Sequence, residues 1–130
     1  MDMNELKILI VDDFNSMRNI IRSILKELHY SNIDEAENGE AALKMLNKKE
    51  YDLVLTDWNM PYMNGLELLQ AIRKDEKLMH IPVLMLTSEV KKENVIHAAK
   101  EGASGYIVKP FNAATLHQKI KSSKQFQLQL

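Results

Sequence analysis

The sequence predicts an α/β fold in which a doubly wound, parallel sheet of five strands is covered by helices on both faces. Short apolar runs alternate along the chain with segments whose apolar residues recur at helical spacing, in the order βαβαβαβαβα. The main runs, at 6–11, 53–55 and 83–86, are almost continuously apolar, which is typical of strands buried on both faces. A further apolar strand is predicted at 105–108, and a short, weak strand at 33–36.

The first two helices follow the first two strands. The first helix has one apolar face, and Asn15 or Ser16 is available as its N-cap. That face consists of Met17, Ile20, Ile21, Ile24, Leu25 and Leu28. The second helix is predicted over 40–46, after the Asn38–Gly39 turn, with its apolar residues directed inward.

The next two helices have clear end signals. The third begins near Asn64, and Glu67, three residues later, completes a capping-box pattern. The fourth is predicted over about 91–101, and Gly102 lies where a left-handed C-terminal cap belongs. The inward face of the fourth helix is predicted to be Val95, Ile96 and Ala99.

The fifth helix begins after Asn112 and places Leu116 and Ile120 on one face. Helical periodicity is lost over residues 122–130, which we expect to fray. No repeat, low-complexity tract or linker interrupts the pattern, so a single domain is predicted for residues 1–130.

Composition excludes several classes of function. The 17 basic and 18 acidic residues give a net charge of −1, which predicts binding neither to nucleic acid nor to an anionic membrane. The absence of cysteine excludes disulfides and thiolate zinc sites and fits a reducing cytoplasm. The longest apolar runs have four to six residues, far fewer than a membrane span needs. We therefore expect a soluble, cytoplasmic protein.

Polar residues stand at the carboxyl ends of four of the predicted strands. Asp12 and Asp13 follow the first strand, and Asp57 follows the third. Thr87 and Lys109 follow the fourth and fifth. Because parallel α/β sheets bind ligands beyond the carboxyl ends of their strands, this pattern predicts a single site.

Three acids in one crevice repel one another unless cations balance them. A divalent cation together with Lys109 would neutralise the group, and all-oxygen ligation of this kind suits Mg²⁺. A carboxylate in such a site can act as a nucleophile and form an acyl phosphate. Taken alone, Asp12 and Asp13 can equally be acids that stop a strand and favour the start of a helix.

Several motifs together resemble the receiver domain of bacterial two-component response regulators, over the chain up to about residue 121. These motifs are Val11-Asp12-Asp13, Asp57-Trp58-Asn59-Met60-Pro61, Asn64-Gly65, Thr87-Ser88 and Lys109-Pro110-Phe111. Within the family, residues 85–96 and 102–116 are most similar to the single-domain chemotaxis regulators. The resemblance implies a flavodoxin-like (βα)5 fold with strand order 2-1-3-4-5. It also implies a phosphorylation-controlled signalling protein, and not an enzyme that acts on an external substrate.

The resemblance assigns roles to the matching residues. Asp57 accepts a phosphoryl group from a sensor histidine kinase, and Thr87 and Lys109 contact that group. Asp13 and Asp57 ligate Mg²⁺ directly with the backbone carbonyl of Asn59, whereas Asp12 acts through a water. The Lys109–Pro110 peptide is expected to be cis, and Trp58 is expected to be a partly exposed ring beside the site.

The family also implies a switch face made by the fourth helix, fifth strand and fifth helix. Tyr106 and Thr87 are expected to shift together on phosphorylation and rearrange this face. Its candidate residues are Tyr106, Lys91, Lys92, Val95, Ala99 and Lys119. The implied partner is the flagellar motor switch protein, a dedicated phosphatase is a further candidate, and the chain is expected to be a monomer. The lysines can equally be an ordinary solvated surface.

Two other functions remain open. A stand-alone receiver can act as a phosphate sink or relay, or can regulate a partner outside the flagellum. A haloacid-dehalogenase-like phosphatase also uses an aspartyl phosphate, but it carries a second acid two residues after the nucleophile. Asn59 occupies that position, which argues against turnover of a substrate. Asn59 and Glu89 flank the site and are expected to influence water access.

Overall fold

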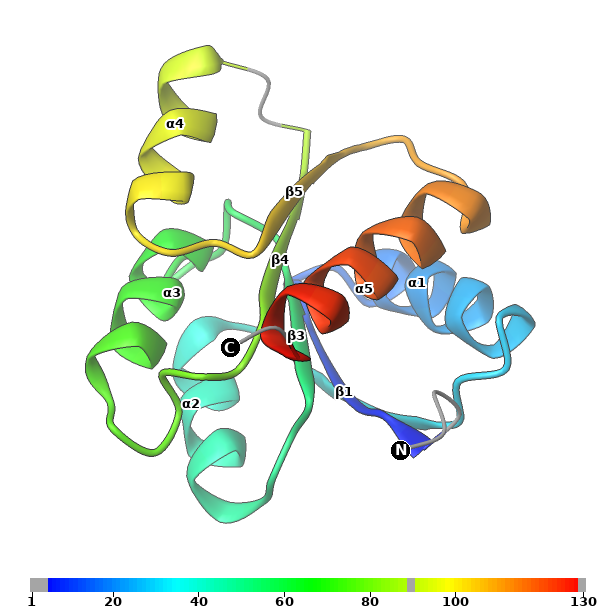
Figure 1. Cartoon of the computed structure of the whole chain (residues 1–130), viewed down its shortest axis with the longest axis horizontal. Coiled ribbons are helices and arrows are strands. Elements are labelled where there is room, and N and C mark those ends of the chain that lie inside the picture. Colours follow the sequence, from blue (N-terminus) through cyan, green and yellow to red (C-terminus); the bar gives the residue numbers. More distant parts are fainter. Residues whose placement is uncertain (1–4, 89–90, 129–130) are drawn as a thin grey trace.

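A computed structural model describes residues 5–88 and 91–128 of the chain, with side chains described through Ser123. Within these residues, five parallel strands form one sheet in the order β2-β1-β3-β4-β5, which confirms the predicted class and strand order (Figure 1). The strands are β1 (Lys7–Val11), β2 (Asn32–Ala36), β3 (Leu53–Thr56), β4 (Val83–Thr87) and β5 (Gly105–Val108).

Helices cover both faces of the sheet. They are α1 (Asn15–Glu27), α2 (Gly39–Lys48), α3 (Gly65–Lys74), α4 (Lys92–Lys100) and α5 (Ala113–Leu128). Helices α2, α3 and α4 lie on one face, and α1 and α5 lie on the other (Figure 1). None of the described helices combines the length and the apolar character that a membrane span requires.

The two faces of the sheet bury different side chains of the same strands. Leu9 and Val11 of β1 pack in the cluster with α2, α3 and α4. Ile8 and Ile10 pack in the cluster with α1 and α5. Because successive side chains of a strand point to opposite faces, a strand covered on both sides has to be apolar throughout. This arrangement explains the continuous apolar runs in the sequence.

Strand register brings the polar strand ends together. Val11 of β1 pairs with Thr56 of β3, and Thr87 of β4 pairs with Val108 of β5. The ladder continues one step beyond the strands, because the Asp57 N–H donates to the Val11 carbonyl oxygen at 2.9 Å. Asp57 and the residues that follow β1 therefore leave the sheet at the same edge.

The helix starts match the sequence signals at α3 but not at α1. Asn64 and Glu67 form the predicted capping box at the start of α3. At α1 the prediction that Asn15 or Ser16 is the N-cap was wrong, because Phe14 occupies that position without a side-chain cap. The reason lies upstream, where the Asp12 carboxylate accepts the Phe14 N–H at 2.9 Å and stabilises the turn before the helix.

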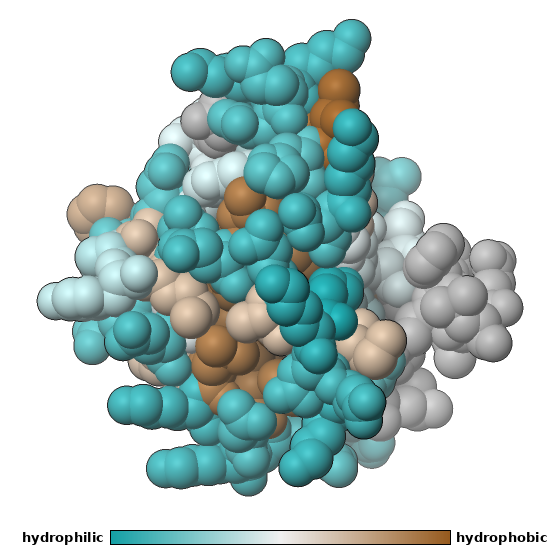
Figure 2. Space-filling model, turned by 90° about the vertical axis from the view of Figure 1, so that its left-hand side faces the viewer, coloured by the Kyte–Doolittle hydropathy of each residue, from teal (hydrophilic) through white to brown (hydrophobic). Residues whose placement is uncertain are grey.

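Two predicted apolar faces are rotated or incomplete. Ile20 of α1 is 51% exposed, although it belongs to the predicted inward stripe. In α4 the buried residue is Ala98, whereas Ile96 and Ala99 are exposed and Val95 is half-buried. Figure 2 shows that the side of the molecule formed by α2, α3 and α4 is mainly hydrophilic, with separate small hydrophobic areas. Helix α4 thus contacts the core through Ala98, a residue that was not part of its predicted inward face.

The C-terminal elements follow the remaining predictions. Gly102 has φ +99°, which confirms the left-handed cap after α4. Leu116 and Ile120 of α5 are buried as predicted. The backbone of α5 is helical through Leu128, beyond the end of its apolar periodicity, and the predicted fraying of 122–130 stays a prediction. Residues 129–130 lie outside the described part of the chain.

Candidate functional site

Three carboxylates meet at the carboxyl edge of the sheet. Asp12 and Asp13 follow β1, Asp57 follows β3, and one oxygen from each lies within 4.8 Å of the others. Asp12 is 1% exposed and Asp57 is 8% exposed, so their charges are largely removed from water. The structure thus brings together the three acids that the sequence placed at strand ends.

Lys109 supplies a positive charge to this cluster. Its Nζ lies 3.1 Å from Asp12 Oδ2 and 3.7 Å from Asp57 Oδ1. The backbone of Lys109 is held against the end of β4, because the Lys109 N–H donates to the Thr87 carbonyl oxygen at 2.9 Å. The Lys109–Pro110 peptide is cis, as expected. The charge of Lys109 does not balance three acids, of which Asp12 and Asp57 are buried and Asp13 is half-buried, so the group keeps excess negative charge.

The pKa of the Asp57 carboxyl is raised above its ordinary value. Burial is the largest cause, and the negative charge of Asp12 acts in the same direction. The Lys109 cation, the Trp58 N–H and the Thr87 hydroxyl oppose the rise in the pKa. The Trp58 N–H donates to Asp57 Oδ1 at 2.8 Å. The folded protein therefore favours the protonated form of Asp57 more than the unfolded chain does.

This shift predicts a pH-dependent stability. The folded state holds the Asp57 proton more tightly than the unfolded chain does. The contribution of this group to the free energy of unfolding is therefore greatest below the ordinary pKa of 3.8. As pH rises through the raised pKa, the free energy of unfolding should fall. Urea unfolding in the presence of EDTA, from acidic to neutral pH, should show this decline in the parent chain and a weaker one in Asp57→Asn. Parallel profiles for the two proteins would contradict it.

Asp13 provides the observation that tests whether a cation fits. Its Oδ1 is buried and has no hydrogen-bond partner in the structure. A buried carboxylate oxygen without a donor is costly unless a cation occupies the site. Three carboxylates that offer only oxygen suit a hard divalent ion such as Mg²⁺. Asn59 is exposed two residues beyond Asp57, and the role of its backbone carbonyl stays a prediction.

The aromatic residues near the site are in contact with each other. Trp58 is half-buried, as predicted, and its ring meets the Tyr106 ring edge-on at a centroid distance of 6.4 Å and an angle of 65°. This contact links the residue after Asp57 to β5. Thr87 is fully buried at the end of β4. Glu89 lies outside the described residues.

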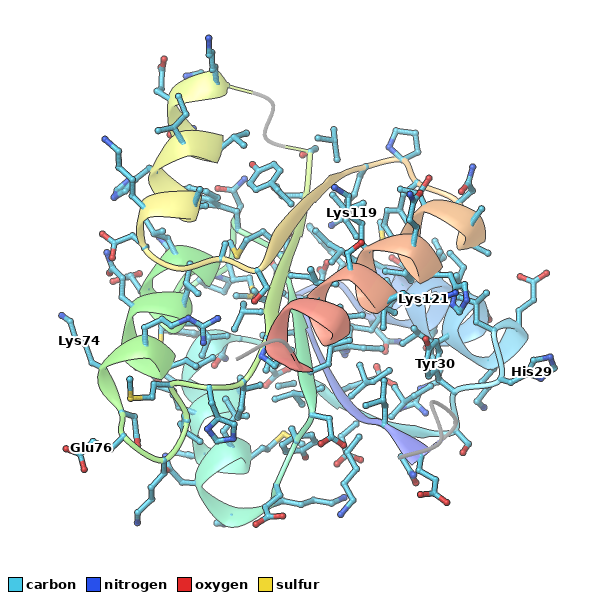
Figure 3. All side chains as sticks on the ribbon, viewed as in Figure 1. His29, Tyr30, Lys74, Glu76, Lys119 and Lys121 are labelled. Carbon is cyan, nitrogen blue, oxygen red and sulfur yellow. The ribbon has the colours of Figure 1, made fainter. Side chains whose placement is uncertain are left out.

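The candidate switch-face residues occupy two neighbouring regions. Tyr106 and Lys119 line the same groove of about 290 Å³ beside β5 and α5, and Figure 3 shows Lys119 extending from α5 near β5. Lys91, Lys92 and Ala99 are exposed in and before α4. Figure 1 shows β5 between α4 and α5, so these residues belong to one side of the molecule.

Sequence reasoning missed one residue of the site environment. Arg18 of α1 donates from Nη1 to the Asp12 carbonyl oxygen at 2.6 Å. It also forms an ion pair with Glu35 of β2 at 2.9 Å. An arginine on the polar side of an amphipathic helix is usually solvated, and no motif pointed to this contact.

A family model and the sequences of known proteins match this chain, and they agree with one another. Residues 8–121 match the family model of the response regulator receiver domain. Chemotaxis protein CheY-3 of Vibrio cholerae serotype O1 is 56% identical over 115 residues, which cover 88% of this chain and 88% of that protein. Chemotaxis protein CheY of Pseudomonas aeruginosa is 52% identical over 116 residues, which cover 89% of this chain and 94% of that protein.

Solved structures show the same fold. CheY4 of Vibrio cholerae matches with a TM-score of 0.83 and 35% identity, over 91% of this chain and 98% of that one. A CheY-like response regulator receiver domain protein from Methanospirillum hungatei matches with a TM-score of 0.85 and 31% identity, over 96% of this chain and 98% of that one.

Proposed function

Because this chain belongs to the response regulator receiver domain family and is of the CheY type, we propose that Asp57 accepts a phosphoryl group from a sensor histidine kinase. The observation that supports this proposal most is the cluster of three acids beside Lys109, in which a buried Asp13 oxygen has no hydrogen-bond partner. The family consists of signalling proteins, so the proposed phosphoryl group is a signal. Slow hydrolysis of that group at the same site is part of the proposal.

The residues of the site have complementary roles in the transfer. An Asp57 carboxylate oxygen attacks the phosphorus of a phosphohistidine whose other ring nitrogen carries a proton, the P–N bond breaks, and the imidazole leaves as the neutral ring. Lys109 is close enough to pair with a phosphoryl oxygen, and the Thr87 hydroxyl can donate to another. Asp13, Asp57 and the Asn59 carbonyl would hold Mg²⁺ directly, with Asp12 acting through a water. The ion, when bound, neutralises charge that develops on the transferring group.

The phosphorylated protein is proposed to bind the flagellar motor switch protein through α4, β5 and α5. The edge contact between Trp58 and Tyr106 supports a connection between the site and this face. The name of both chemotaxis relatives supports the choice of target. To change the active fraction from about 1% to about 99%, the phosphoryl contacts must favour the active state by about 5.5 kcal/mol. A few charge-assisted hydrogen bonds are of the right size. We further propose a cytoplasmic monomer.

Trp58 provides a direct test of the site. Its backbone N–H donates a hydrogen bond to the Asp57 carboxylate, so Mg²⁺ binding at that carboxylate should change the Trp58 fluorescence. Beryllofluoride, which mimics a phosphoryl group, should change the fluorescence again. The beryllofluoride response should require both Mg²⁺ and Asp57. An unresponsive tryptophan, or an identical beryllofluoride response in Asp57→Asn, would remove the basis for the proposal.

The target is tested with a peptide from the N-terminus of the flagellar switch protein. Binding that strengthens with beryllofluoride supports motor control, whereas activation without binding favours a phosphate sink, a relay or another partner. A phosphatase acting on external substrates is disfavoured by Asn59, which replaces the acid such an enzyme would need. Sustained hydrolysis of an added phosphomonoester would reverse that conclusion.

A further inference from the structure

Arg18 makes one hydrogen bond to the backbone of the proposed metal site and two to neighbouring side chains. Its Nη1 donates to the Asp12 carbonyl oxygen at 2.6 Å, its Nε to Glu35 Oε1 at 2.9 Å, and its Nη2 to Asn15 Oδ1 at 3.3 Å. We propose that Arg18 is a positioning residue that directs Asp13 toward Mg²⁺ by holding the Asp12–Asp13 peptide. This inference rests on the proposed function, because it assumes that the cation binds at this cluster.

The orientation of the Asp12–Asp13 peptide is important because it sets the direction in which the Asp13 carboxylate points. The other two acids are held by contacts to their side chains. Asp12 accepts from the Phe14 N–H and from Lys109, and Asp57 accepts from the Trp58 N–H. The buried Oδ1 of Asp13 has no such partner. Rotation of the peptide before Asp13 would change its φ angle and move the carboxylate, and the Arg18 contact opposes that rotation.

Arg18 is itself held in place by strand β2. Glu35 accepts from Arg18 through Oε1 and from Arg22 through Oε2, the latter at 2.6 Å. The Arg18 side chain is 14% exposed, so its hydrogen bonds are partly shielded from water. These contacts connect an edge strand of the sheet to the metal site by way of α1.

Arg22 offers a matched control within the same network. It pairs with the same carboxylate and also donates to a backbone carbonyl, in this case that of Ile33 at 3.1 Å. That carbonyl belongs to β2 and does not precede an acid of the site. A substitution of Arg22 therefore removes similar interactions without releasing the Asp12–Asp13 peptide.

Charge and position predict opposite effects on Mg²⁺ affinity. If Arg18 acted only through its charge, Arg18→Met would tighten Mg²⁺ binding by removing a cation, and Arg18→Lys would change nothing. If Arg18 positions the peptide, both variants should bind Mg²⁺ more weakly, because a lysine ammonium cannot reproduce the planar fork.

The experiment is a Mg²⁺ titration of Trp58 fluorescence in the full chain. We expect Arg18→Lys and Arg18→Met to raise the dissociation constant about 10-fold, and Arg22→Lys to stay within about twofold of the parent. Thermal melts without Mg²⁺ verify folding. A further variant, Glu35→Gln, retains Arg18 but weakens its anchor, and should raise the dissociation constant by less than the Arg18 variants do.

The outcomes separate the two levels of the proposal. Parent-like affinity in Arg18→Lys, tighter binding in Arg18→Met, or an equal loss in Arg22→Lys would each overturn the positioning role while leaving the metal site in place. A parent chain that does not respond to Mg²⁺ would overturn the proposed function, and the positioning role with it.

Discussion

Asp57→Asn is expected to abolish phosphorylation of the chain by acetyl phosphate, with a loss of at least about 10³-fold in rate. The carboxamide has no anionic oxygen to attack phosphorus, so the acyl phosphate cannot form. The substitution also removes one of the three negative charges that favour a divalent cation at this site. Intact-protein mass spectrometry after incubation with acetyl phosphate and Mg²⁺ measures the result directly.

Asp52→Asn is the matched control for this substitution. Asp52 precedes the same strand at its opposite end, where its carboxylate accepts the Lys7 N–H at 2.9 Å. An asparagine oxygen can keep that hydrogen bond, so this variant should be phosphorylated like the parent. If Asp57→Asn still gained a phosphoryl group at the parent rate, the acceptor would have to be another residue, such as Asp12 or Asp13.

Gly65→Ala is expected to destabilise the fold by about 1–3 kcal/mol and to disturb the site at the same time. An added Cβ would lie well inside van der Waals distance of the Asp57 carbonyl oxygen and 2.9 Å from its carbonyl carbon. These are backbone atoms, and the Gly65 N–H already binds the Trp58 carbonyl oxygen at 2.8 Å. The loop must therefore move and carry Asp57 with it.

The higher helix propensity of alanine offsets only part of the destabilisation caused by this clash. Alanine favours a helix interior over glycine by about 1 kcal/mol, but Gly65 is the first residue of α3, where the gain is reduced. Urea unfolding measures the loss, and Trp58 fluorescence measures the accompanying weaker Mg²⁺ response.

Gly105→Ala is the control, since it adds the same methyl group near a side-chain atom, Leu84 Cδ2, at 2.7 Å. The end of a leucine side chain can shift more readily than backbone, so this variant should lose less stability. Equal losses in both variants would show that the approach of α3 to Asp57 is not a special constraint.

The composition of the site could be predicted from the sequence because the fold makes strand ends meet. Asp12, Asp57 and Lys109 each follow an apolar run. The carboxyl ends of parallel strands all lie at the same edge of the sheet. Once the runs were identified as parallel strands, proximity of the polar residues followed. The capping box at Asn64 and Glu67 was predictable for a similar reason, since it depends only on residues three positions apart.

Rotations of helices were less predictable. The apolar residues of α4 indicated that Ile96 and Ala99 face inward, but Ala98 is the buried residue. A short helix with few apolar residues can pack in several orientations, and the neighbouring elements select one. The cap of α1 failed as a prediction because the Asp12 side chain, which lies before the helix, binds the Phe14 N–H.

By itself, the sequence determined the α/β class, the order of the elements and the set of polar residues at the strand ends, because apolar periodicity and chain order are local properties. Only the tertiary structure decided that Lys109 pairs with Asp12, that Trp58 meets Tyr106, and that burial raises the pKa of Asp57. It also placed Arg18 on the Asp12 carbonyl and Glu35. Such contacts join residues far apart in the chain, and they depend on strand register and helix rotation, which the packing of the whole domain sets.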